Sequence, residues 1–472
     1  MRRRTLLITA GTVSVSPVLE ACTSPSRKDP APTPPPGPDA IPYKFTERPS
    51  WPGTNISVSI KAARDRYLCS DVAVDELRDV FASGHCPVIV DVAGPTTRAV
   101  TLDETGAWTT KEVALTGRYD KGKDNIKAPT KLWVGPALLD ETHAYLVLGV
   151  LAQQGDDTST TSADDTTTCP VIMLKIRLSD GSVAASATVS DRFFAKEVSG
   201  MHLSFSTDAA SLLLAAGTGD ASAETDHVGL RLSAEDLSIQ LDVRSVLEGK
   251  RAHSTSCGQA VGVTYTNTPG RLIVFLADGS QEPAVANTPI MVRDGWYYYE
   301  EQNETSSRGY ARDLGSGQTV ELSPGWEKDI TLGSWPSIAS DQQEIIALDR
   351  NGSHTGTLTV RNPGAPSIAL SQNRAEGAGI LGDVLYTSYD PDDSDSTSTD
   401  HLVLTSVSTG ETITERDEEM GLSGRAVVTP WGMAYYDSFY AATEWLDSVP
   451  TPASPSSSPS SPVTPTAGTG PS

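Results

Sequence analysis

Several features that would direct a functional assignment are missing from this 472-residue sequence. It contains no His-Glu-x-x-His pair, no Gly-x-Ser-x-Gly segment and no phosphate-binding loop, so these zinc-protease, serine-hydrolase and nucleotide signatures are absent. Positive charge is also scarce, because 36 Lys and Arg residues stand against 60 Asp and Glu, a formal net charge of −24. Nucleic-acid binding needs a basic surface, so a nucleic-acid partner is not expected. The acidic balance instead suits solubility, cations or a basic partner.

The first 22 residues have the pattern of an export signal. Three arginines at positions 2–4 precede an apolar run over 6–19. A charged start, an apolar core of this length and a small residue at the cut are typical of a signal peptide. The segment Leu19-Glu20-Ala21-Cys22 resembles the lipobox of bacterial lipoproteins, although Glu20 departs from that motif. The resemblance implies that Cys22 carries a lipid. The alternative is an ordinary secreted protein in which Cys22 is incidental.

Cysteine is rare, with five in the chain, and neither Cys-x-x-Cys nor a zinc-spaced Cys/His cluster occurs. If Cys22 carries lipid, an even number remains, which in an exported chain predicts two disulfides. Among the three possible pairings we favour Cys69–Cys86 with Cys169–Cys257. The first would close a short loop and stabilise by on the order of 3 kcal/mol.

Low-complexity segments flank a long central region. Residues 22–52 are crowded with proline and predict an extended tether that cannot build a core. Residues 448–472 are almost wholly Pro, Ser, Thr, Ala and Gly and predict a disordered tail. With the signal peptide 1–21 removed as well, residues 53–447 remain, enough for a large core.

A single segment of this central region predicts a helix. Ser70 or Asp71 can cap its start, an apolar stripe runs from 73 to 81, and Gly84 can end it. Nearly all other apolar runs are short, rich in β-branched and aromatic residues, and bounded by Gly, Asp, Asn, Ser or Pro, so they predict strands too short for membrane helices. The clearest strands are 88–92, 145–148, 172–176, 211–214, 271–275, 296–299, 344–348 and 401–404.

A turn signal recurs between these strands, mostly at intervals of about forty to fifty-five residues. It occupies 103–106, 179–181, 234–236, 277–279, 314–317, 362–364 and 408–410. In an all-β chain this period predicts a β-propeller with four strands in each unit.

Two units can be laid out strand by strand. One comprises 289–293, 296–302, 308–314 and 318–322, and the next comprises 335–339, 344–350, 356–361 and 366–370. Three further strands at 425–429, 432–437 and 440–446 need a fourth, for which we expect 55–61. That pairing would join the two ends of the chain and leave no open sheet edge. Eight blades are therefore favoured, with seven as the alternative.

One turn also suggests a family. The segment Leu102-Asp103-Glu104-Thr105-Gly106-Ala107-Trp108 resembles the repeat of quinoprotein-like propellers, which include non-enzymatic members in bacterial envelopes. That repeat has Asp, two residues, Thr-Gly, and a Trp four residues after the Gly. Here one spacer residue is missing, Trp108 comes two residues early, and elsewhere only 408–411 is similar. The adjacent cysteine pair of many quinone dehydrogenases is absent, and we expect no cofactor.

Acidic residues gather in four segments that we predict to be hairpin tips between second and third strands, namely 155–165, 219–226, 300–304 and 390–400. In a propeller all loops of this class emerge on one face, so these tips predict an acidic binding face. Its principal residues are Asp156, Asp157, Asp164, Asp165, Asp392, Asp393 and Asp395. Clustered oxygens suit calcium, but the turn glycine and distal Glu of a calcium loop are missing. Solvated tips are therefore preferred, and calcium is the alternative.

For two further patterns we prefer a structural interpretation to a functional one. The segments 225–228 and 399–402 both read Thr-Asp-His before an apolar residue and open a third strand. A His beside an Asp can act as a general base or a metal ligand, but these segments fall in opposite blades and cannot share a metal. Trp133, Trp335 and Trp431 could floor a cofactor pocket, although packing between blades is preferred.

Together these observations predict a monomeric extracytoplasmic β-propeller, held at the cell membrane only through a lipid on Cys22. Its predicted role is that of a binding or scaffold module for an envelope protein or a glycan, through the acidic face. No catalytic residue is assigned, so an enzyme is disfavoured. The alternatives are a hydrolase or quinoprotein-like enzyme with a site at the channel mouth, and a calcium-stabilised structural propeller.

Overall fold

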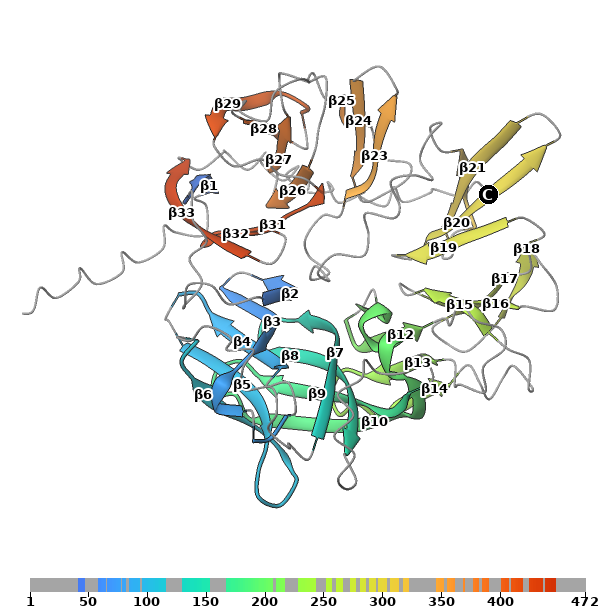
Figure 1. Cartoon of the computed structure of the whole chain (residues 1–472). Helices are drawn as coiled ribbons and strands as arrows, with labels where there is room; N and C mark the ends of the chain where they lie inside the picture. The colour runs from blue at the N-terminus through green and yellow to red at the C-terminus, as the bar shows by residue number, and fades with distance from the viewer. Residues whose placement is uncertain are drawn as a thin grey trace, which may run out of the picture. The chain divides into compact units, whose positions relative to one another are not determined.

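The computed structural model consists, in the residues that it describes, of β-strands with two short 3-10 helices, so the predicted all-β fold class is confirmed (Figure 1). These residues belong to the compact unit Pro36–Ser472. They are 41–46, 58–64, 66–77, 79–81, 85–93, 96–115, 130–152, 167–206, 209–216, 228–242, 252–256, 260–265, 272–276, 281–285, 288–293, 296–303, 306–313, 317–321, 345–351, 355–360, 368–369, 377–381, 384–389, 400–406, 409–418, 424–435 and 438–446.

The strands of the described residues form eight sheets, numbered in chain order. The first contains β2 (Val58–Arg64), β3 (Tyr67–Ala73), β4 (His85–Asp91), β5 (Thr96–Leu102) and β6 (Trp108–Val113). The second contains β7 (Thr130–Leu139), β8 (His143–Ala152), β9 (Thr168–Arg177) and β10 (Val183–Phe194). The third contains β11 (His202–Phe205), β12 (Ser211–Ala216), β13 (Val228–Ser233) and β14 (Ile239–Asp242). The fourth contains β15 (Ala252–Ser256), β16 (Ala260–Tyr265), β17 (Leu272–Leu276) and β18 (Gln281–Val285).

The fifth and sixth sheets follow the same plan of consecutive antiparallel strands, while the seventh adds a parallel strand and the eighth adds a strand from the start of the domain. The fifth contains β19 (Thr288–Arg293), β20 (Trp296–Asn303), β21 (Ser306–Asp313) and β22 (Thr319–Glu321), and the sixth contains β23 (Ile345–Asn351), β24 (Thr355–Val360) and β25 (Ile368–Ala369). The seventh contains β26 (Gly377–Leu381), β27 (Val384–Tyr389), β28 (Asp400–Ser406) and β29 (Thr412–Glu418), with β30 (Gly424–Arg425) parallel to β26. The eighth contains β31 (Val427–Thr429), β32 (Gly432–Tyr435), β33 (Ser438–Leu446) and β1 (Ile41–Phe45).

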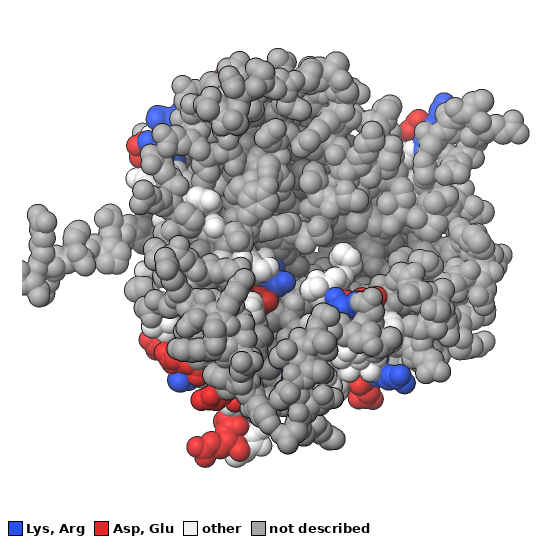
Figure 2. Space-filling view, viewed as in Figure 1, with Lys and Arg blue, Asp and Glu red and all other residues white. Residues whose placement is uncertain are grey.

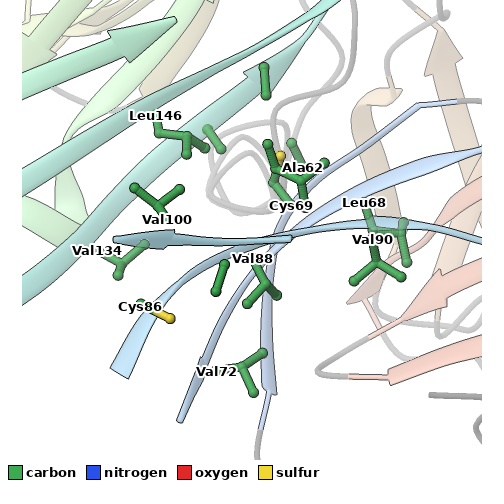
Figure 3. Close-up of a cluster of buried hydrophobic side chains, with 14 of the residues drawn as sticks. Ala62, Leu68, Cys69, Val72, Cys86, Val88, Val90, Val100, Val134 and Leu146 are labelled. Atoms are coloured by element: carbon green, nitrogen blue, oxygen red, sulfur yellow. The ribbon is translucent and has the colours of Figure 1, made fainter. Parts of the chain in front are cut away.

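Apolar side chains join sheets that follow one another in the chain. One buried cluster combines residues of the eighth, first and second sheets, with Val100 of β5, Val134 of β7 and Leu146 of β8 among them (Figure 3). A second cluster joins the second and third sheets, and a third joins the seventh and eighth. Repeated antiparallel sheets of about four consecutive strands, packed on one another, are the organisation of a β-propeller. Eight sheets match the number of units expected, while the number of blades stays a prediction.

The seven recurrent turn signals all join the last two strands of a sheet, as the bounds of the flanking strands show. In the second sheet, Asp180 Oδ1 accepts hydrogen bonds from the backbone N–H and the hydroxyl of Ser182 at 2.8 and 2.7 Å, and Gly181 takes a φ of 75°. The third sheet repeats this turn, but Leu237 stands in place of the glycine with a φ of 61°. Asp and Gly favour such turns because Asp caps the backbone and Gly tolerates positive φ.

The helix expected after position 70 is much shorter than predicted. Ser70 and Asp71 lie inside β3, and the helical part is the 3-10 turn η1 (Asp75–Leu77). The apolar stripe from 73 to 81 fits a helical period, yet Ala73 lies in β3, and Leu77 and Phe81 are buried beyond that strand. Tertiary packing therefore overrides the local helical pattern. The second helix, η3 (Ala195–Gly200), was not predicted.

The strand that completes the eighth sheet is β1, not residues 55–61. Ile41 lies opposite Leu446 and Phe45 lies opposite Ala442, so the first described strand pairs with the last (Figure 1). The expectation that the two ends of the chain pair is confirmed, but the segment was wrong, because 58–64 forms β2 of the first sheet. The span 22–52 assigned to a tether therefore contains a strand of the folded domain.

Candidate functional site

The seven aspartates of the predicted acidic face lie outside the described residues, but the strands on either side of them are described. Residues 153–167 connect β8 to β9, and residues 390–399 connect β27 to β28. The segment 219–226 lies between β12 and β13, whereas 300–303 belong to β20 and only Glu304 lies in the connection to β21. Each connection joins the second and third strands of its sheet. Three of the four segments therefore lie between a second and a third strand, and their gathering on one acidic face stays a prediction.

Of the other residues singled out in the sequence, some also lie outside the described part of the chain and others lie within it. Cys22, Cys257, His227 and Trp335 lie outside the described residues. His401 belongs to β28, where it pairs with Asp417 of β29. Trp133 and Trp431 are partly buried and pack against apolar clusters, in agreement with a packing role.

The predicted Cys69–Cys86 disulfide is wrong, since both cysteines are buried free thiols. Cys69 lies opposite Ile89 while Cys86 lies opposite Val72, so the two are three residues out of register on neighbouring strands. An odd offset places side chains on opposite faces of a sheet, and three residues span about 10 Å. A disulfide needs Cα atoms within about 7 Å. Cys169 is also a buried free thiol, so the companion Cys169–Cys257 bond is not formed either.

Burial also makes these thiols poor nucleophiles. It raises the pKa of Cys69 and Cys86 far above the ordinary value, and it raises the pKa of Cys169 to about 11. A thiol reacts as its thiolate, which is nearly absent at neutral pH when the pKa lies so high. The three described cysteines are therefore core residues.

A group of titratable side chains lies at the turn from β7 to β8. Asp140 Oδ1 accepts hydrogen bonds from the backbone N–H groups of Thr142 and His143, both at 2.6 Å, and from the Thr142 hydroxyl at 3.0 Å. Asp140 Oδ2 accepts a fourth from the Tyr145 hydroxyl at 2.9 Å. Burial alone would raise the pKa of Asp140, but these hydrogen bonds outweigh it and the pKa is lowered. The carboxylate is thus held ionised by its own turn.

The pKa values of two neighbours of Asp140 are shifted in directions that keep these side chains neutral. Burial, followed by the charge of Lys175, lowers the pKa of His143. Burial, followed by the hydrogen bond to Asp140, raises the pKa of Tyr145. The cluster therefore combines one carboxylate with a neutral imidazole and a neutral phenol near pH 7.

Lys175 and Tyr145 connect this cluster to the third sheet. The buried Lys175 Nζ donates to the carbonyl oxygens of Ala234 and Glu235 at 2.8 and 3.0 Å, and Tyr145 Oη lies 3.3 Å from the Ala234 carbonyl. Both carbonyls belong to the recurrent turn between β13 and β14. A buried cation that satisfies turn carbonyls holds two sheets together.

The same device joins the first and second sheets. Arg98 Nη1 donates to the Leu178 carbonyl at 3.3 Å, and Thr110 Oγ1 donates to the Gly181 carbonyl at 2.7 Å. Leu178 and Ala234 occupy the same place in their turns. Leu178 directly follows the last residue of β9, and Ala234 directly follows the last residue of β13. In both cases a cation on the penultimate strand of one sheet reaches the outer turn of the next. This cluster is best explained as an inter-sheet clamp.

A second titratable group lies on the first sheet. Asp71 Oδ1 is 3.3 Å from His85 Nδ1, and this hydrogen bond is the chief cause of a raised His85 pKa. Burial lowers the pKa of Lys61, and this effect outweighs the negative charge of Asp71, which raises that pKa. Within the described residues, no group of three or more His, Cys, Asp or Glu side chains is arranged to hold a metal ion. Nor does the described part contain a helix that is long and apolar enough to span a membrane.

We predict that the charge of Asp140 contributes stability at neutral pH. Its folded pKa lies below the unfolded value of about 3.9, so the contribution is complete above that value and is lost as the pH falls through the folded pKa. Asp140→Asn keeps the turn acceptor but removes the charge, and should lower the free energy of unfolding at pH 7 by about 1 kcal/mol. Urea unfolding at pH 7, 4 and 2 should show this difference shrinking towards zero.

Glu141→Gln provides the control for Asp140, because the Glu141 side chain is 84% exposed. Its difference from the unmodified protein should be small at every pH. A difference for Asp140→Asn that is the same at pH 7 and pH 2 would show that its charge does not stabilise the turn.

No family model and no curated protein matches the chain. Among solved structures, the chain is similar to the Dos1 propeller, with a TM-score of 0.41 and 11% identity over 85% of this chain and 95% of that chain. It is also similar to BamB from Moraxella catarrhalis, with a TM-score of 0.33 and 11% identity over 76% and 91%. For AztD from Citrobacter koseri the TM-score is 0.25, with 12% identity over 79% and 97%. At these identities the likeness concerns the fold alone. The sheet organisation of the chain itself is that of a β-propeller.

Proposed function

We propose that this chain is an extracytoplasmic β-propeller, tethered to the cell membrane by a lipid on Cys22, that binds a basic partner of the cell envelope through its acidic second-to-third-strand hairpins. The observation that carries this proposal is topological. Three of the four acidic segments lie between the second and third strands of their sheets, and the fourth, 300–304, lies mostly in the second strand of its sheet and runs into that connection. In a propeller, connections of one class emerge on one face, so their charges would add together there.

The tether is supported by the way the chain enters the fold. The proline-rich segment that follows Cys22 leads directly into β1, which pairs with β33. A polyproline segment spans about 3.1 Å per residue, so the residues between Cys22 and Ile41 could hold the domain several tens of ångströms from a membrane. That distance would place a binding face within reach of envelope components.

Two charge variants of equal size test the binding proposal. The first carries Asp156, Asp157, Asp164, Asp165, Asp392, Asp393 and Asp395 as Asn. The control replaces Asp79, Asp103, Glu104, Glu112, Glu141, Glu235 and Glu411 by their amides, and these side chains are exposed and belong to none of the four acidic segments. Figure 2 shows that acidic atoms of the described residues gather where Figure 1 draws β5 and β6, the sheet that provides Glu104 and Glu112. Each variant moves the formal net charge from −24 to −17.

Crosslinking in native envelopes, followed by quantification of the captured partner, gives the readout. We expect the first variant to lose the partner and the control to keep it, and we expect capture by the unmodified chain to weaken as salt rises. Equal loss in both variants would indicate general charge attraction without a binding face. Capture that is unchanged in the first variant would overturn the proposal.

A further inference from the structure

The outer strand of the second sheet, β10, is a long strand with one unpaired edge. It has 12 residues, and the first eight, Val183–Ser190, contain no charged residue, no proline and no glycine. Within the described part of the chain, β10 pairs with β9 on one side and with no strand on the other (Figure 1). A row of backbone N–H and C=O groups along this edge is therefore available to another extended strand.

The outer strands of the other described sheets carry features that block such pairing. Four of the seven residues of β29 are charged, and β6 contains Lys111 and Glu112. Both β18 and β1 contain a proline. The strands β14, β22 and β25 have four residues or fewer. Charge, proline and short length protect sheet edges from pairing with another chain, and Val183–Ser190 has none of these protections.

The side chains of β10 hold the strand in place and leave its outer face open. Ala185 and Ala187 are partly buried and pack against the apolar cluster that joins the second and third sheets. Ala184, Ser186 and Thr188 alternate with them and are exposed. Because β10 is already extended and anchored, accepting a further strand would cost it little conformational entropy.

Charge indicates which strand suits this edge. Two copies of a chain with a net charge of −24 repel each other over most of their surface. The uncharged run of β10 is an exception, because each of its ends carries one acidic and one basic residue. Arg177 and Asp180 lie at the turn before β10, and the exposed Asp191 and Arg192 follow Ser190. Antiparallel pairing of two copies brings the start of one run beside the end of the other, so opposite charges meet at both ends.

We infer that two copies of this chain form a dimer by antiparallel pairing of β10 with β10. Residues directly opposite each other in a sheet share a face, so the two-fold axis passes through a residue that lies opposite itself. Ser186 is the exposed residue at the middle of the uncharged run. With Ser186 on the axis, Ala184 lies opposite Thr188 of the second copy, and Arg192 comes beside the turn that holds Asp180.

This dimer differs from the monomer expected from the sequence, and it depends neither on the lipid nor on the acidic hairpins. An interface of eight residues from each copy is smaller than the standard size of about 1,600 Å², so we expect a dissociation constant on the order of 50 μM. Analytical ultracentrifugation of the full chain, from about 5 to about 500 μM, should show the average mass rise from one copy towards two.

A lysine on the axis tests the position of the interface. Ser186→Lys places two like charges directly opposite each other and should weaken the dimer about fivefold or more. Thr412→Lys is the matched control, because Thr412 is exposed on the outer strand β29 and its replacement adds the same charge. The control should dimerise like the unmodified chain.

Disulfide crosslinking tests the register. Ser186→Cys should form a disulfide between two copies on oxidation, because the two cysteines lie opposite each other. Thr188→Cys should not, since its two copies lie about 13 Å apart along the strands. A chain that stays monomeric at every concentration, whether its edge accepts a strand of another protein or none, would overturn the dimer. So would equal dimerisation of the two lysine variants or equal crosslinking of the two cysteine variants. Neither lipidation nor partner capture enters these measurements, so failure here is distinct from failure of the proposed function.

Discussion

Replacing Phe45 by Ala should lower the free energy of unfolding by about 3–5 kcal/mol, the range observed for buried Phe-to-Ala substitutions. Phe45 is 4% exposed although it lies in the first described strand, directly after a proline-rich segment. Its ring centroid is 6.1 Å from that of Tyr386, and it belongs to a cluster with Val384 of the seventh sheet and Met433 of the eighth. The substitution would leave a cavity where the two sheets meet.

Urea unfolding measures this effect, with Lys44→Ala as the matched control in the same strand. The Lys44 side chain is 43% exposed and makes a single long ion pair with Glu444, so its loss should cost no more than about 0.5 kcal/mol. A loss below about 1 kcal/mol for Phe45→Ala would mean that β1 is dispensable to the fold.

Gly432→Ala should be comparably severe, with a loss of about 3 kcal/mol or more. Gly432 opens β32 opposite Ala441 of β33. A Cβ at this position would collide with the Tyr440 carbonyl oxygen and approach the Ala441 Cα at 3.0 Å. Backbone atoms within a sheet cannot move aside without breaking the ladder, and the φ of Gly432, 156°, is one that other residues rarely adopt.

Substitutions of two other glycines serve as controls, which separate the cost of steric crowding from the cost of an unfavourable backbone φ. Gly200→Ala should be nearly neutral, because a Cβ there meets no atom within 4 Å and its φ is ordinary. Gly106→Ala meets no atom either, but its φ of 81° should cost about 1 kcal/mol. If Gly432→Ala were no worse than Gly106→Ala, close approach of the backbone would not be the reason for glycine at this position.

The outer turns were predictable because their chemistry is local. Asp180 and Gly181 shape their own hairpin through hydrogen bonds and a positive φ within a few residues. The unit at 289–322 was laid out strand by strand and forms the fifth sheet, β19 to β22. For the same reason three of the four acidic segments could be assigned to second-to-third-strand connections.

The errors all concern residues whose partners are distant in the chain. The apolar stripe over 73–81 matches a helical period, but it begins in β3, and Leu77 and Phe81 are buried by packing beyond that strand. Cys69 and Cys86 are close in sequence, yet the register of β3 and β4 turns them to opposite faces. The inter-sheet clamp was missed because nothing near Lys175 in the sequence points to the carbonyls of Ala234 and Glu235.

By itself, the sequence determined the all-β class, the four-strand period and the outer turns, because period-2 burial and Asp-Gly turn chemistry act within a few residues. Only the tertiary structure decided which strand completes the eighth sheet. Residues 41–45 and 58–64 both have strand character, and the choice between them depends on contacts with Tyr386 and Leu446, which lie more than 300 residues away. Such a choice is made by packing and register between sheets, which no local pattern encodes.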